Sequence, residues 1–295
     1  MRAALSTIAV ERPRDLAHAL RRMSAEAANG RLTPIAGGTD LLVYLNAGTH
    51  DGRGFLDLWG LAELSGIRSG RAGVTLGALT TFSEIREHAG LARRFPALVE
   101  AAAVVGARQI QNRATLAGNI ANASPAGDSL PVLMALDAIV HARSTRGARA
   151  IPFGTLYHGY RDLSLAPDEL ITAVEIPFAR PKSRQFFRKV GTRLAQSISK
   201  VVMAGVLRLG GDGRVDHVRL GWGSVAPVTL LAAHAGEALM GVKPSRAAAA
   251  RARAALMHDI APIDDIRSDR DYRLAVAGNL LEQFLRAVDP RFARS

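Results

Sequence analysis

Residues 34–41 read Pro-Ile-Ala-Gly-Gly-Thr-Asp-Leu and form the stretch from which the fold can be read. A short apolar strand over residues 32–36 ends at Gly37-Gly38, and Thr39 or Asp40 can cap a helix that follows. Glycine permits unusual backbone angles, and the free N–H groups of a helix start bind phosphate well. Taken alone, this loop is most simply an ordinary tight turn with a capped helix.

A second loop of similar character covers residues 115–129, Thr-Leu-Ala-Gly-Asn-Ile-Ala-Asn-Ala-Ser-Pro-Ala-Gly-Asp-Ser. It combines small residues with hydroxyl, amide and carboxylate side chains between two apolar helices. Such a loop can be buried only if its polar groups bind one another or a polar ligand. Two loops of this kind in one domain indicate a nucleotide cofactor, with two self-satisfied loops as the alternative.

The remaining elements alternate irregularly and predict a mixed α+β fold. Thr81 and Glu84 have the spacing of a capping box, and Gly210-Gly-Asp-Gly predicts a hairpin turn. Residues 178–183 are a plausible linker between domains. Helices are expected at 13–29, 81–87, 96–105, 130–136, 229–240, 245–257 and 269–288, and strands at 55–58, 66–68, 74–76, 138–142, 148–152, 170–176, 185–190, 201–209 and 215–222.

Length and composition limit the class of protein. A chain of 295 residues suggests two domains. It contains no Cys, which excludes disulfides, thiol chemistry, Cys-ligated zinc and an iron–sulfur cluster bound by this chain alone. No signal-type segment and no apolar run long enough to span a membrane is visible, so a soluble cytoplasmic protein is expected.

The formal net charge of +12 invites a nucleic-acid interpretation, but its distribution argues against one. Residues 1–177 carry 18 basic and 16 acidic side chains, whereas residues 178–295 carry 20 and 10. Aromatic residues make up only 5% of the chain, so a platform for stacking bases is missing. The charge better fits a local site for anions or a partner. An acid-free basic run comprises Arg180, Lys182, Arg184, Arg188, Lys189, Arg193, Lys200 and Arg208.

Other motifs are weaker. Residues 221–226, Gly-Trp-Gly-Ser-Val-Ala, imitate a dinucleotide fingerprint, yet no βαβ unit follows them, and Pro227 most simply starts a helix. The eight His residues show no metal-ligand spacing, and no metal site is expected. Asp264-Asp265 is interpreted as solvated loop charge. Lys189, one of four Lys, is by itself most simply a surface charge.

Taken together, the motifs resemble a known family. Ala36-Gly-Gly-Thr-Asp40, Thr115-Leu-Ala-Gly-Asn119 and Ala123-Ser-Pro-Ala-Gly-Asp128 resemble the FAD-binding (medium) subunit of molybdenum hydroxylases of the xanthine dehydrogenase and carbon monoxide dehydrogenase type. The resemblance continues through residues 160–171, Arg188-Lys-Val-Gly-Thr-Arg193 and Tyr272-Arg-Leu274, in order and over essentially the whole chain.

The resemblance implies a vanillyl-alcohol-oxidase-type (PCMH) FAD-binding domain in two subdomains over residues 1–177. A smaller domain over residues 184–291 is expected to combine a three-stranded antiparallel sheet with a helix bundle. Both glycine-rich loops would wrap the FAD pyrophosphate, with Leu165 and Lys189 near the flavin. The implied cofactor-binding residues are Pro34, Ile35, Ala36, Gly37, Gly38, Thr39, Asp40, Leu41, Val105, Thr115, Ala117, Gly118, Asn119, Ser124, Asp128, Leu165 and Lys189.

The same resemblance implies an electron relay without a catalytic residue for hydroxylation on this chain. A large subunit with the molybdenum cofactor and a small subunit with [2Fe–2S] clusters would be partners, in a heterotrimer or its dimer. FAD here would pass electrons to NAD⁺ or another acceptor. Two alternatives remain: a self-contained flavin oxidoreductase of the same fold, and, from another class, a basic nucleic-acid-binding protein.

Overall fold

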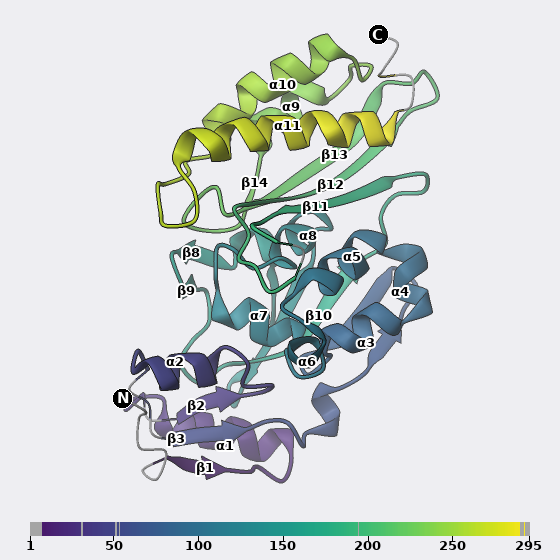
Figure 1. The fold of residues 1–295 in the computed structure, drawn as a ribbon. Coiled ribbons are helices and arrows are strands. Elements are labelled where there is room, and N and C mark those ends of the chain that lie inside the picture. The colour runs from purple at the N-terminus through teal and green to yellow at the C-terminus, as the bar shows by residue number, and fades with distance from the viewer. Residues whose placement is uncertain are drawn as a thin grey trace.

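The structure is a computed structural model that describes residues 8–30, 32–50, 52, 54–193, 195–289 and 292. It has three tiers, with a small sheet at the base, a larger sheet and its helices in the middle, and a helix-covered sheet at the top (Figure 1). Both glycine-rich loops belong to the lower two tiers.

The base is a three-stranded parallel sheet with strand order β1-β3-β2. Its helix α1 is held by Asp15, whose carboxylate accepts a hydrogen bond from the amide of His18 at 2.6 Å. The helix buries Leu16, Ala19, Leu20 and Met23, which share one face at helical spacing. The elements are β1 (Ala9–Glu11), α1 (Leu16–Glu26), β2 (Leu32–Ile35), α2 (Leu41–Ala47) and β3 (Gly54–Asp57).

The middle tier is a five-stranded antiparallel sheet of order β4-β5-β10-β6-β7, with helices α3 to α8 beside it. The expected capping box is present, because Thr81 and Glu84 bond to each other's backbone amides. The strands are β4 (Ile67–Ser69), β5 (Gly73–Gly77), β6 (Ile139–Ser144), β7 (Gly147–Pro152) and β10 (Leu170–Pro177). The helices are α3 (Phe82–Glu87), α4 (Ala89–Arg94), α5 (Pro96–Val104), α6 (Arg108–Gln111), α7 (Leu116–Asn122) and α8 (Leu130–Ala135). A small hairpin, β8 (Tyr157–Gly159) with β9 (Asp162–Leu163), lies near α7.

The top tier is an antiparallel sheet of order β11-β12-β13-β14. The three expected strands are present, and a two-residue fourth strand joins them where a helix was predicted to begin after Pro227. The helix of that segment therefore starts only at Ala233. The elements are β11 (Arg184–Val190), β12 (Val201–Leu209), β13 (Val215–Gly223), β14 (Leu230–Leu231), α9 (Ala233–Leu239), α10 (Arg246–Asp259) and α11 (Arg270–Val288).

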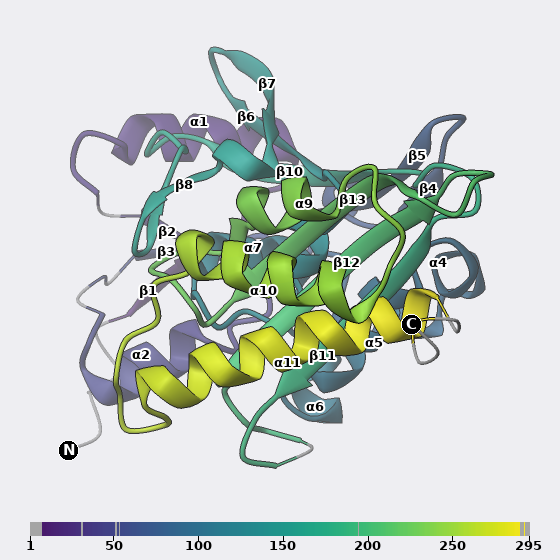
Figure 2. The ribbon, with the colours of Figure 1, turned by 90° about the horizontal axis from the view of Figure 1, so that it is seen from above.

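The top sheet is covered on both faces. Helices α9, α10 and α11 lie on its upper face, and α5 and α8 lie below it (Figures 1 and 2). Strand β12 reads Val-Val-Met-Ala-Gly-Val-Leu and is buried throughout these residues. Its alternate side chains enter different cores: Val202 joins the core of the lower tiers, whereas Met203 joins the core under α11. The largest core therefore continues from the first part of the chain into the second.

Candidate functional site

The first glycine-rich loop joins the end of β2 to the start of α2. Gly38 has φ +75°, a left-handed conformation that favours glycine. Among the described residues, none accepts a hydrogen bond from the backbone amides of Gly37, Gly38, Thr39 or Asp40. Asp40 occupies the N-cap position of α2, but its carboxylate makes no capping bond. The loop therefore presents a row of free N–H donors.

This loop touches the segment that leads into the second glycine-rich loop. A Cβ atom at Gly37 would lie 1.8 Å from the carbonyl oxygen of Arg113, so no side chain fits there. Arg113 is fixed in turn, since its guanidinium stacks over the ring of Trp59 at 3.6 Å. The two glycine-rich segments, distant in sequence, thus form one surface.

The second loop contains a helix that its composition did not reveal. Residues 115–129 were expected to be a loop, yet α7 lies inside this range. Thr115 caps α7 by accepting a hydrogen bond from the amide of Gly118 at 3.0 Å. The side chain of Asn119 is also bound within the loop, because its Oδ1 atom accepts a hydrogen bond from the hydroxyl of Ser129 at 2.7 Å. The polar side chains of this loop are thus partly satisfied by one another.

A polar cluster of Tyr44, Asn122 and Arg161 lies near Asp40 of the first loop. The Tyr44 hydroxyl donates to Asn122 at 2.9 Å and accepts from Arg161 at 2.7 Å. These contacts join α2, the end of α7 and the β8–β9 turn. Desolvation by the surrounding protein raises the pKa of Asp40, and the positive charge of Arg161 opposes that rise. The cluster places a cation beside the loop amides, which suits an anionic ligand.

A buried ion pair lies at the other end of the candidate site. Lys189 of β11 donates to Asp128 at 2.6 Å and to the carbonyl of Val104 at 3.2 Å, and both charged side chains are 8% exposed. Ser199 donates a hydrogen bond to the second carboxylate oxygen. Burial raises the pKa of Asp128, whereas the adjacent lysine and serine lower it. Lys189 is therefore not the surface charge that its sequence context suggested.

The other implied residues differ in burial. Ala117 is buried, while Val105 and Leu165 are half-buried and pack against the core of the lower tiers. Ser124 accepts a hydrogen bond from the amide of Ala126 at 3.3 Å. Pro34 is exposed at the edge of β2, and Ile35, Ala36 and Leu41 are half-buried beside it. Within the described residues, no hydrogen bond or ion pair links the first loop directly to the Asp128–Lys189 pair.

Several residues at or near the site had no distinguishing signal in the sequence. Tyr44 and Ser199 are common polar types, and only the folded chain brings each to its partners. Arg161 lies in the stretch 160–171 that carries the resemblance but was not singled out as a site residue. Arg273 stands within a motif noted above, but its burial was not foreseen: it is 4% exposed and donates to the carbonyls of Lys200 and Ser224. Its guanidinium lies 2.7 Å from Asp265, so that carboxylate is not a solvated loop charge as predicted.

The fingerprint-like segment at residues 221–226 has a packing explanation. A Cβ atom at Gly221 would lie 2.1 Å from the carbonyl oxygen of Pro131, and one at Gly223 would lie 3.0 Å from that of Pro125. The amide of Ser224 donates to Pro125 at 2.8 Å. These glycines therefore leave room for the backbone carbonyls of α8 and of the segment before it. No dinucleotide is needed to account for them.

The described ranges contain neither a cluster of metal ligands nor a helix that could span a membrane. No group of three or more His, Asp or Glu side chains could hold a metal ion there. No helix in that part of the chain is both long and apolar enough to cross a membrane.

Known proteins resemble this chain over nearly its whole length. Residues 6–179 match a family described as "FAD binding domain in molybdopterin dehydrogenase", and residues 185–288 match "CO dehydrogenase flavoprotein C-terminal domain". The xanthine dehydrogenase FAD-binding subunit of Escherichia coli O157:H7 is 32% identical over 253 residues, 84% of this chain and 85% of that protein. The carbon monoxide dehydrogenase medium chain of Afipia carboxidovorans is 28% identical and covers 96% of both chains. The reconstituted CO dehydrogenase structure from Oligotropha carboxidovorans superposes with a TM-score of 0.91 at 26% identity, over 96% of this chain and 97% of that one.

Proposed function

Because this chain belongs to the FAD-binding subunits of the molybdenum hydroxylase family, we propose that it carries electrons from an iron–sulfur partner through FAD to NAD⁺. The membership itself establishes an FAD-dependent oxidoreductase subunit that acts within a multi-subunit complex. The acceptor, the residues that hold FAD and the composition of the complex are parts of the proposal. We also propose that residues 1–177 form the cofactor domain and residues 184–291 the second domain, the latter ending outside the described residues.

In this proposal the two glycine-rich loops bind the pyrophosphate. The supporting observation is the contact of Gly37 with Arg113, which places the free amides of residues 37–40 beside the start of the second loop. Backbone N–H groups at helix starts are strong donors to phosphate oxygens. The guanidinium of Arg161 adds a positive charge at the same edge. The residues present therefore fit a dinucleotide with two anionic phosphates.

The Asp128–Lys189 pair is assigned to the flavin end of the site. Leu165 supplies an apolar surface for a ring, and Lys189 supplies a donor whose charge is largely balanced by Asp128. When bound, FAD would supply the conversion between one-electron and two-electron transfer. This chain would orient the ring, exclude water with its half-buried apolar residues and hold the lysine in place through Asp128, Ser199 and Val104.

The proposed partner subunits carry the iron–sulfur clusters and the molybdenum cofactor. This chain has no Cys, so the [2Fe–2S] clusters that deliver electrons belong to another subunit, and the molybdenum cofactor to a third. A heterotrimer, or a dimer of heterotrimers, is the proposed assembly. The relatives named above are a FAD-binding subunit and a medium chain, which supports this arrangement.

The loop assignment is tested by flavin content. Gly38→Val requires a side chain at φ +75°, and Gly118→Val brings Cβ to 2.8 Å from Oγ1 of Thr115, which would break the cap of α7. We expect purified Gly38→Val and Gly118→Val proteins to lose the visible flavin spectrum and to take up no FAD on reconstitution. Gly60→Val is the control, because nothing lies within 4 Å of a Cβ there.

The melting temperature of each variant without FAD shows whether the fold survives. Folded variants that keep a full complement of FAD would refute the loop assignment. A wild-type chain that binds no flavin would refute the proposed function as a whole, and salt-sensitive binding to random DNA would then favour a nucleic-acid partner. Steady NADH oxidation by the isolated chain would instead favour a self-contained oxidoreductase.

A further inference from the structure

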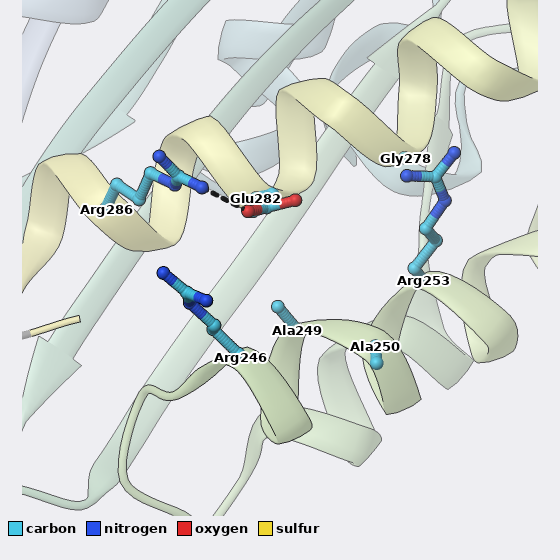
Figure 3. Close-up of a pocket in the computed structure, with 7 residues that line it drawn as sticks. All are labelled: Arg246, Ala249, Ala250, Arg253, Gly278, Glu282 and Arg286. Carbon is cyan, nitrogen blue, oxygen red and sulfur yellow. Dashed lines mark hydrogen bonds and ion pairs between the residues drawn. The ribbon is translucent and has the colours of Figure 1, made fainter. Parts of the chain in front are cut away.

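Helices α10 and α11 enclose a groove on the outer side of the top tier, separate from the glycine-rich loops (Figures 1 and 3). Its volume is about 370 Å³. Along α10 it is lined by Arg246, Ala249, Ala250 and Arg253, and on the opposite helix by Gly278, Glu282 and Arg286. The guanidinium groups thus come from both walls, with small side chains between them.

The positive charges of this groove are poorly compensated. Among the described residues of its lining, the only carboxylate is that of Glu282, which pairs with Arg286 at 2.5 Å. Within the described ranges, Arg246 has no hydrogen-bond or ion-pair partner, and Arg253 bonds only to the side-chain oxygen of Asn279, at 3.1 Å. Arg246 also stands in the first turn of α10, where the helix dipole disfavours a cation. The groove therefore has a net positive potential that an anion would relieve.

Part of the groove is shaped for an arginine to lie across the helix. A Cβ atom at Gly278 would be 2.3 Å from Nε of Arg253, so the guanidinium in this conformation occupies the space that a side chain at Gly278 would take. A glycine inside a helix lowers its stability, and Gly278 lies well within α11. The absence of a side chain at Gly278 leaves room for Arg253, which points toward it in Figure 3.

The arrangement discriminates between kinds of anion. Arg246 and Arg253 are seven positions apart on one helix, which corresponds to about 10 Å along its axis, too long for one phosphate to bridge. None of the described residues that line the groove is aromatic, so none of them can stack on a base. A polypeptide segment satisfies the spacing, since acidic residues seven positions apart on a helix share one face at the same interval.

We propose that the α10–α11 groove binds an acidic segment of a partner subunit, with one carboxylate at the Arg246–Arg286 end and another at Arg253. Small side chains of that segment would rest on Ala249 and Ala250. This inference rests on the proposed assembly with partner subunits. It gives the excess charge of residues 178–295 a specific place, on α10 and α11 as well as on the basic run.

The test is assembly of the full chain with its co-expressed partner subunits. A charge-reversal variant, Arg246→Glu with Arg253→Glu, is compared with a control, Arg251→Glu with Arg270→Glu, which changes the net charge equally at exposed positions outside the groove. The dissociation constant of the complex is measured at low and high salt, with FAD content and melting temperature checked for each protein.

We expect the groove variant to weaken assembly at low salt by at least about tenfold and to lose most of the salt dependence, while the control stays within about threefold of wild type. Equal affinities of the two variants would overturn this inference and leave the proposed function standing. A wild-type chain that forms no complex would overturn the proposed assembly and this inference together. Displacement of the wild-type chain from the complex by an acidic peptide, but not by inorganic pyrophosphate, would support the peptide class, and the reverse would overturn it.

Discussion

Asp128 and Lys189 lie on opposite sides of the linker at residues 178–183, yet their side chains form one buried ion pair. Removing the charge from one partner leaves the other uncompensated in a site with little water. The hydroxyl of Ser199 and the carbonyl of Val104 complete this small network. The proposed cofactor site and the junction of the two parts of the chain therefore share these residues.

We expect Asp128→Asn to lower the free energy of unfolding by about 3 kcal/mol, because it leaves a buried ammonium without its counter-charge. Urea denaturation of the cofactor-free protein measures the change. Asp137→Asn is the matched control: Asp137 pairs with Arg219 but is 67% exposed, so its loss should cost less than about 1 kcal/mol. Equal losses in the two variants would contradict the importance given to burial. Asp128→Asn with Lys189→Met should recover part of the stability.

The sequence indicated which residues belong to the candidate site better than it indicated what those residues contact. Gly37 was named as a cofactor-binding residue, but the sequence did not indicate that its missing side chain leaves room for the carbonyl of Arg113. Ser199 could not be foreseen, because its partner Asp128 is distant in sequence and serine has no distinctive spacing. The expected cation at Lys189 is half of a pair, since charge balance depends on a neighbour that only the fold supplies.

The loop between β9 and β10 shows how one element holds the site. Arg149 of β7 forms two hydrogen bonds with Glu169, both at 2.7 Å, and also donates to the carbonyl of Ser164. Glu169 accepts a further bond from the amide of Ala166 at 2.7 Å. These contacts clamp the segment that carries Leu165. The hydrogen bonds of Arg149 lower the pKa of Glu169, with burial acting in the opposite direction.

A lowered pKa in the folded state means that this carboxylate stabilises the fold above its ordinary pKa, and that the contribution disappears as the pH falls through the folded value. We therefore expect Glu169→Gln to unfold at lower urea concentration than wild type at neutral pH. The difference should shrink as the pH falls below 4.5, the ordinary value. A difference that stays constant with pH would show that the ionised carboxylate is not responsible. Glu282→Gln, at a half-exposed pair on α11, controls for the general effect of losing a surface carboxylate.

Helices and strands were predicted well where the hydrophobic pattern agreed with the capping and turn residues at the ends of the element. The capping box at Thr81, the hairpin of β6 and β7 and the three long strands of the top sheet are all present. The misses have physical causes. Helix α7 lies in a stretch rich in Gly and Asn, which disfavour helices, and its Thr115 cap and tertiary packing override that preference. Strand β14 is only two residues long and depends on pairing with β13.

At the scale of the molecule, the core does not divide where the sequence suggests a linker. Val202, Ala204 and Val206 of β12 and Phe187 of β11 belong to the same core as the five-stranded sheet. The linker is itself attached, because Phe178 stacks on Phe95 and its amide donates to Ala72 at 2.8 Å. Two segments that match separate families thus share this core, and the second segment also has a core of its own under α11.

We accordingly expect a single cooperative unfolding transition. The chain has two Trp, Trp59 beside the first loop and the fully buried Trp222 in the top sheet. The variants Trp59→Phe and Trp222→Phe each keep one Trp. For each variant, the unfolding curve followed by tryptophan fluorescence should coincide with the curve followed by circular dichroism. Two separate transitions, one for each tryptophan, would show that the parts unfold independently. Comparison of each variant with wild type by circular dichroism controls for the substitution itself.

Strand β11 is one edge of the top sheet, and its exposed residues include Arg184 and Arg188. An unpaired strand edge can template pairing with another chain, and charged side chains on the edge discourage this. The opposite edge is closed by β14, which has only two residues and offers little backbone to pair with. The basic run that first suggested a nucleic-acid partner therefore also guards the sheet against edge-to-edge aggregation between copies of this protein.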